Sequence, residues 1–97
     1  MDGIHFLKER VKNAPTSPGV YRMLNTQGEV LYVGKAKHLK NRLLSYTRAE
    51  GLSSRIRKMV FETKDLILVE TTTEAEALLL EANLIKSLKP KYNIIFR

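Results

Sequence analysis

Apolar and polar residues alternate with two different periods along the chain, and these periods predict its elements. At the start, Ile4, Leu7 and Val11 stand at helical spacing among charged residues, which predicts a short amphipathic helix over residues 4–13. Two prolines soon afterwards end this run, because proline cannot continue a helix. Residues 19–24 and 29–33 are then β-branched, aromatic or aliphatic, and the Asn-Thr-Gln-Gly turn between them predicts a β-hairpin.

The rest of the chain predicts three more helices and two more strands. Apolar spacing predicts one helix over residues 39–46 and another that begins after the Ser53-Ser54 cap. A Thr-Glu-Ala-Glu capping box predicts the start of a third helix, over residues 75–88. The two strands are a central strand at residues 66–69 and a last strand at residues 92–96. This order, α, β, β, α, α, β, α, β, predicts an α+β fold in which helices flank a small mixed or antiparallel sheet. Its length of 97 residues predicts a single domain over 1–97.

Two tyrosines and two glycines of the hairpin fall opposite each other if the turn is symmetric. Tyr21 would then pair with Tyr32, and Gly19 with Gly34, so that two phenols lie side by side next to a patch without side chains. On the pairing alone, an aromatic pair that covers the core is the favoured explanation of the phenols. A single bulge would break this register.

Glu81 is out of place on the predicted helix over 75–88. Its neighbours on the helical wheel are Ala77, Leu78, Leu84, Ile85 and Leu88, so its carboxylate would project from the packed face. A buried charge without compensation costs several kcal/mol, and Glu81 should therefore have a partner. A structural ion pair with Lys or Arg, a metal ion and hydrogen bonds all satisfy this requirement.

The charge of the chain indicates a polyanionic partner. Lys and Arg number 17 against 10 acids, for a net charge of +7, and eight of the basic residues lie between residues 35 and 58. Without a long apolar or basic amphipathic stretch, this charge favours nucleic acid over a membrane. The chain has no Cys and no export signal, so we expect a cytosolic protein without disulfides or thiolate metal sites. His5 and His38 lack partners at ligand spacing and are predicted to be surface residues.

Several motifs resemble those of the GIY-YIG nucleases. Gly19-Val20-Tyr21 and, ten residues later, Tyr32-Val33-Gly34 match the paired signature with Val in place of Ile. The similarity continues through Lys35-Ala36-Lys37, Asn41-Arg42-Leu43, Ser45-Tyr46, residues 80–86 and Lys89-Pro90-Lys91-Tyr92-Asn93. The whole string is most similar to the N-terminal endonuclease domains of the UvrC family, over about residues 15–93.

This resemblance implies an activity and a set of partners. It implies a Mg²⁺- or Mn²⁺-dependent cut in one strand of damaged double-stranded DNA, on the 3′ side of the lesion, during bacterial nucleotide excision repair. In that family the module opens a longer protein whose other parts bind UvrB, so residues 1–97 would be the N-terminal part of such a protein. We expect the domain itself to be monomeric and to use a single divalent ion.

The resemblance also implies roles for individual residues. Glu81 matches the metal-binding carboxylate. Tyr32 matches the general base that takes a proton from the attacking water. This role requires that positive charge from the metal or Lys35 favours the phenolate form of Tyr32. Tyr21 would position Tyr32 or the water, Arg42 would stabilise charge on the phosphoryl oxygens, and Gly34 would leave room for DNA. Lys35, Tyr46 and Asn93 match further active-site positions. Non-specific phosphate contacts are expected from the remaining basic residues, Lys37, Lys40, Arg48, Arg55, Arg57 and Lys58.

Two other hypotheses remain open at this point. The chain would be a stand-alone GIY-YIG nuclease with another substrate, or a nucleic-acid-binding module without catalytic activity. The second of these predicts salt-sensitive DNA binding without metal-dependent cleavage.

Overall fold

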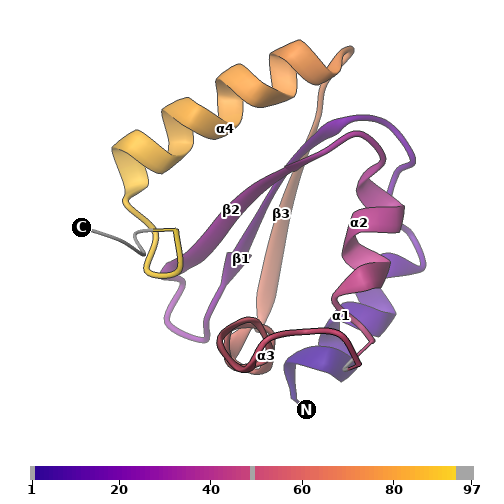
Figure 1. The fold of residues 1–97 in the computed structure, drawn as a ribbon, viewed down its shortest axis with the longest axis vertical. Helices are drawn as coiled ribbons and strands as arrows, with labels where there is room; N and C mark the ends of the chain where they lie inside the picture. Colours follow the sequence, from indigo (N-terminus) through magenta and orange to yellow (C-terminus); the bar gives the residue numbers. More distant parts are fainter. Residues whose placement is uncertain (1, 49, 94–97) are drawn as a thin grey trace.

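A three-stranded antiparallel sheet forms the centre of the computed structural model, which describes residues 2–48 and 50–93 (Figure 1). The elements are α1 (Gly3–Val11), β1 (Gly19–Leu24), β2 (Val30–Ala36), α2 (Leu39–Ser45), α3 (Ser54–Glu62), β3 (Asp65–Glu70) and α4 (Glu74–Leu88). The α+β prediction is confirmed, and the sheet is antiparallel rather than mixed.

The helices begin where the sequence provides capping side chains. Asp2, His38 and Ser53 each accept a hydrogen bond from the backbone N–H three residues later, at the starts of α1, α2 and α3. At the start of α4, Thr73 and Glu76 form the predicted capping box. α4 ends at Leu88, and the C-cap residue Lys89 has a φ of 46°, in the left-handed region.

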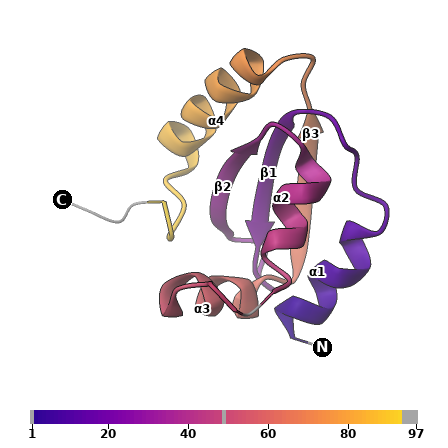
Figure 2. The same ribbon diagram turned by 45° about the vertical axis from the view of Figure 1, so that its right-hand side comes forward.

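The helices cover the two faces of the sheet unequally. α4 lies on one face, and α1, α2 and α3 lie on the other, as the views in Figures 1 and 2 agree. The larger part of the core lies beneath α1, α2 and α3 and includes Leu7, Tyr21, Met23, Leu39, Leu43 and Met59. The smaller part lies beneath α4, where Ala77 packs on Val20 and Val33. α4 therefore crosses the sheet with only a narrow apolar contact.

The prediction of a central strand at 66–69 is wrong in position. The strand order is β2-β1-β3, so β3 is an edge strand and β1 is the centre. β1 is buried at five of its six positions, whereas the burial of β3 varies along its length. A short apolar run in the sequence does not distinguish a central strand from an edge strand, because both positions in a sheet can bury part of the strand.

The hairpin register also differs from the symmetric prediction. Tyr21 pairs with Gly34, Gly19 pairs with Ala36, and Tyr32 pairs with Met23. The loop is one residue longer than assumed, since Asn25 pairs with Glu29, and a bulge follows between the pairs of Leu24 and Met23. The longer loop and the bulge each shift the strand pairing by one residue. One such shift would move the side chains of β2 to the opposite face of the sheet, and the second shift returns them to the predicted face. Tyr21 and Tyr32 therefore share a face as predicted, but as diagonal neighbours.

The end of the chain is not a strand where the structure describes it. Tyr92 and Asn93 lie in a turn, and residues 94–96 of the predicted strand lie outside the described residues. The turn still reaches the sheet, because Tyr92 N–H donates to the Leu31 carbonyl at 2.8 Å. Within residues 2–48 and 50–93, no helix is long and apolar enough to cross a bilayer.

Gly34 has no room for a side chain, and this provides a test of the hairpin packing. A Cβ at this position would clash with the Tyr21 ring and hydroxyl. We predict that Gly34→Ala lowers the free energy of unfolding by about 1–3 kcal/mol, as overpacking does, measured by urea denaturation. The control is Gly28→Asn, at a φ of 81° in open space, which should cost less than about 1 kcal/mol. Equal stabilities of the wild type and Gly34→Ala would contradict this packing.

Candidate active site

Three tyrosines from three elements meet on the face of the sheet that α2 covers. Tyr21 in β1 and Tyr46 at the end of α2 share a hydrogen bond of 2.6 Å between their hydroxyls. The Tyr21 ring also packs against the Tyr32 ring of β2, with centroids 6.1 Å apart. Tyr21 is fully buried and Tyr46 is 7% exposed, whereas Tyr32 is only partly buried. Tyr32 is therefore the one of the three whose surface a substrate reaches most easily.

The structure gives the contacts of two residues with expected roles. The hydroxyl of Tyr21 bonds to that of Tyr46 rather than to Tyr32, and the Tyr21 side chain is fully buried. Its ring, not its hydroxyl, supports Tyr32. The space beside Gly34, expected to admit DNA, is filled by that same ring.

The electrostatic surroundings of Tyr32 come from several elements. Burial is the main cause that raises the pKa of Tyr32, and the nearby Tyr46 and Glu81 act in the same direction. Arg42 lowers the pKa of Tyr32 by its positive charge. The Coulombic interaction with Tyr21 is in turn the main cause that raises the pKa of Arg42. Arg42 and Glu81 thus both lie close enough to Tyr32 to influence its pKa, in opposite directions.

Lys35 lies on the other face of the sheet from Tyr32. It is three residues beyond Tyr32 in β2 and so projects from the opposite face, as an exposed side chain. In the protein without a metal, the positive charge that favours the Tyr32 phenolate is that of Arg42. The predicted contribution of the metal or Lys35 stays a prediction.

Glu81 lies at the margin of the packed face of α4. Ala77 is buried and Leu84 and Ile85 are partly buried, but Leu78 and Leu88 are 52% and 40% exposed, so the packed face is narrower than predicted. The Glu81 side chain is partly buried. In the described part of the chain its carboxylate forms no hydrogen bond and no ion pair, so the predicted alternative of a structural ion pair does not hold there.

The donor set around Glu81 suits a hard divalent cation with an open coordination sphere. No group of three or more His, Cys, Asp or Glu side chains able to hold a metal occurs among the described residues. A single carboxylate leaves most ligand positions to water and to oxygens of a substrate, which is how Mg²⁺ is commonly bound. The residues present therefore fit such an ion at Glu81.

Asn93 closes the outer edge of β2 beside Tyr32. Its side-chain Oδ1 accepts from Val33 N–H at 2.8 Å, and its Nδ2 donates to the Val33 carbonyl at 2.9 Å. One amide thus satisfies both edge groups of the residue that follows Tyr32, as a neighbouring strand would. Asn93 is thus fixed against the residue that follows Tyr32, and its role in the site stays a prediction.

A hollow of about 320 Å³ lies between the end of β2, α2 and the start of α4. It is lined by Lys35, Ala36, Lys37, His38, Asn41, Arg42 and Glu74. Arg42 connects this hollow to the tyrosine cluster. His38 is partly buried here, with its Nδ1 accepting from Asn41 N–H at 3.1 Å. Asn41, which belongs to one of the motifs that resemble the GIY-YIG nucleases, therefore lies in this hollow beside Arg42.

The other predicted DNA contacts are dispersed. Lys37 pairs weakly with Glu74 at 3.8 Å, and Lys40 donates to the Lys12 carbonyl. Arg55 stacks on the Tyr92 ring, 4.9 Å from its centroid, which is a structural role. α3, which carries Arg55, Arg57 and Lys58, lies at the opposite end of the sheet from the hollow, and Arg48 is exposed beyond α2 (Figures 1 and 2). These six residues therefore come from several elements and not from one helix.

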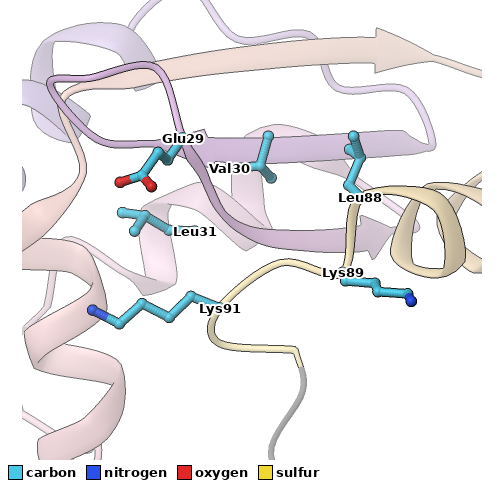
Figure 3. A pocket seen from close by; sticks show the side chains of 6 residues that line it. All are labelled: Glu29, Val30, Leu31, Leu88, Lys89 and Lys91. Carbon is cyan, nitrogen blue, oxygen red and sulfur yellow. The ribbon is translucent and has the colours of Figure 1, made fainter.

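A second hollow, of about 400 Å³, lies at the other end of β2. Glu29, Val30, Leu31, Leu88, Lys89 and Lys91 line it (Figure 3). Its walls are the first residues of β2 and the turn that follows α4. None of the residues that line this second hollow is a predicted catalytic residue. The second hollow is larger than the one beside Arg42, so the volume of a hollow does not indicate where the candidate active site lies.

Comparison with known proteins gives consistent matches. A family model described as a UvrC-like GIY-YIG domain matches residues 17–94. UvrABC system protein C of Chelativorans sp. (strain BNC1) is 53% identical over 95 residues, and that of Gluconobacter oxydans is 55% identical over 95 residues. These alignments cover 98% of this chain but only 14% and 15% of the respective relatives.

Solved structures resemble the fold closely. The GIY-YIG N-terminal endonuclease domain of UvrC from Thermotoga maritima, bound to its catalytic magnesium, has a TM-score of 0.82 at 40% identity and covers 91% of this chain and 96% of that chain. A tyrosine-to-phenylalanine point mutant of that domain, also bound to the catalytic divalent cation, has a TM-score of 0.83 at 38% identity over 92% of this chain and 96% of that chain.

The opposing effects of Glu81 and Arg42 on Tyr32 are measurable. In metal-free protein, we predict that Glu81→Gln lowers the pKa of Tyr32, because a negative neighbour is removed, and that Arg42→Gln raises it, because a positive neighbour is removed. NMR titration of protein labelled at tyrosine Cζ measures both shifts. Glu29→Gln, at the far end of the hairpin, is the control and should leave the Tyr32 titration unchanged. Shifts of the opposite sign would contradict the described arrangement.

Proposed function

The chain belongs to the family of UvrC-like GIY-YIG domains, and on this basis we propose that it is a divalent-metal-dependent DNA endonuclease domain. The observation that carries the proposal is the partly buried Glu81 carboxylate, which has no ion-pair partner among the described residues and lies close to Tyr32. The reaction we propose is hydrolysis of one phosphodiester on the 3′ side of a lesion, in bacterial nucleotide excision repair.

Glu81 would hold the metal ion. A carboxylate oxygen is a ligand that Mg²⁺ and Mn²⁺ accept, and the magnesium-bound relative from Thermotoga maritima supports the same choice for this chain. When bound, such an ion supplies Lewis acidity toward the phosphate and lowers the pKa of water. Everything else in the reaction must come from side chains around the edge of β2.

Tyr32 would act as the general base. A phenol that is protonated takes no proton, and burial raises the pKa of Tyr32, so its deprotonation requires positive charge nearby. Arg42 provides one such charge, and a divalent cation would offset the effect of Glu81. Tyr32 would then accept the proton of the water that attacks the phosphorus.

Arg42 would stabilise the phosphate as charge develops on its oxygens. Its guanidinium keeps its proton, and its planar set of donors matches phosphoryl oxygens. The buried Tyr21–Tyr46 pair would hold Tyr32 and Arg42 in place, and Asn93 would hold the β2 edge. Lys35 and Lys37, in the hollow beside Arg42, would contact phosphates of the same strand.

The substrate and partners of a longer protein are part of this proposal. The chain spans about one seventh of the curated relatives it matches, and these are UvrABC system proteins. We propose that damage recognition and contact with UvrB depend on other parts of such a protein, and that this domain works as a monomer on double-stranded DNA in the cytoplasm.

Three substitutions test the assigned roles. The experiment uses a chimeric protein in which this chain replaces the N-terminal endonuclease domain of a UvrABC system protein C. The assay measures 3′ incision of a damaged duplex in the presence of Mg²⁺ and the other proteins of that system. Glu81→Ala, Tyr32→Phe and Arg42→Ala should each slow incision by at least about 100-fold, because each removes a transition-state contribution of that order. Glu81→Ala should also abolish Mn²⁺ binding by the isolated chain, whereas Tyr32→Phe should retain it.

The control is Lys8→Ala, which removes an exposed positive charge from α1 and should leave the rate within about twofold. Circular dichroism verifies that each variant is folded. Full activity of one of the three variants would disprove its assigned role. Salt-sensitive DNA binding by the wild type without any Mg²⁺-dependent incision would instead favour a binding module.

A further inference from the structure

Leu78 occupies an unusual place on the surface of α4. Glu74, Leu78 and Glu81 are spaced four and three residues apart, so they form one stripe along the helix. Glu74 pairs with Lys37 beyond the end of β2, and Glu81 lies near Tyr32. Leu78 is thus placed between the basic hollow and the metal-binding carboxylate.

The surroundings of Leu78 do not explain its apolar character. It is 52% exposed, although the helical wheel assigns it to the packed face. It lines a small hollow of about 170 Å³ together with Lys35, Ala36, Lys37, Glu74, Ala75 and Ala77. The other side chains of this hollow are charged or are alanines, so no large apolar side chain covers Leu78 there.

Leu78 lies on the path from Glu81 to the basic hollow. Glu74 and Glu81 are about 10 Å apart along the helix axis, and Leu78 is about 4.5 Å from the level of Glu81. Leu78 also lines the same small hollow as Lys35 and Lys37. A DNA strand that ran from a metal ion held by Glu81 to Lys35 and Lys37 would therefore pass over Leu78.

We propose that Leu78 packs against the deoxyribose and base of the nucleotide next to the scissile phosphate. This inference rests on the proposed function and names a substrate contact for it. The charges of Lys35 and Lys37 favour a DNA strand as the occupant, since both side chains are exposed and line the same hollow. Apolar contacts with nucleotides complement phosphate contacts because sugar and base faces are poorly solvated. Leu78 would thereby help to hold the phosphate at Glu81.

Leu79 provides a matched control for Leu78. It is the adjacent leucine of the same helix and is even more exposed, at 67%. It stands two residues from Glu81, and residues at this separation do not face each other on a helix. Any general effect of removing an exposed leucine from α4 will therefore be present in Leu79→Ala as well.

The test compares Leu78→Ala, Leu78→Met and Leu79→Ala in the same chimeric protein and incision assay. Leu78→Ala should lower kcat/KM about tenfold through a higher KM, Leu78→Met should stay within about threefold of wild type, and Leu79→Ala should stay within about twofold. The Mn²⁺ affinity and melting temperature of the isolated chain should be the same in all variants.

Equal kcat/KM values for Leu78→Ala and Leu79→Ala would overturn the contact while leaving the proposed function intact. A loss of Mn²⁺ affinity in Leu78→Ala would also overturn it, because Leu78 would then act through Glu81. If the wild-type chimera does not incise while the unmodified relative does, the proposed function fails, and the inference that depends on it fails too.

Discussion

The burial of Tyr21 is the interaction on which the site depends. Its ring fills the space that Gly34 leaves empty, and its hydroxyl bonds to Tyr46 at 2.6 Å. These contacts connect β1, β2 and the end of α2, which are the elements that carry Tyr32 and Arg42. An unpaired buried hydroxyl would cost about 1–3 kcal/mol, so the bond between Tyr21 and Tyr46 favours one arrangement of the three elements. The position of Tyr32 follows from this arrangement.

The candidate site spans the edge of the sheet rather than one of its faces. Tyr21 and Tyr32 belong to the face covered by α2, whereas Glu81 comes from α4 on the other face. The two layers meet at β2 because it is an edge strand. An edge strand exposes backbone groups, and Asn93 satisfies those of Val33 without adding another strand. The backbone groups of Val33 at this edge are thus hydrogen-bonded, although no further strand among the described residues covers the edge of β2 there.

The electrostatics of the site are unbalanced without a ligand. Burial, Tyr46 and Glu81 all raise the pKa of Tyr32, and only Arg42 among its named neighbours opposes them. The Glu81 carboxylate has no cation beside it among the described residues. A divalent cation at Glu81 would correct both features, since it would pair with the carboxylate and favour the phenolate. This imbalance is what a site prepared for a metal and a phosphate is expected to have.

Local patterns in the sequence were sufficient for the four helices, the three strands, the capping box of α4 and the anomaly of Glu81, because periodicity and capping act over a few residues. They did not reveal the turn at Tyr92 and Asn93, where a strand was predicted. Only the tertiary structure decided that β3 lies at the edge, that Tyr21 opposes Gly34, and that Arg42 acts on the pKa of Tyr32. Strand order depends on packing between distant segments, and register depends on the loop length and bulge together. The exposure of Leu78 likewise depends on where α4 passes the sheet edge, which no local spacing specifies.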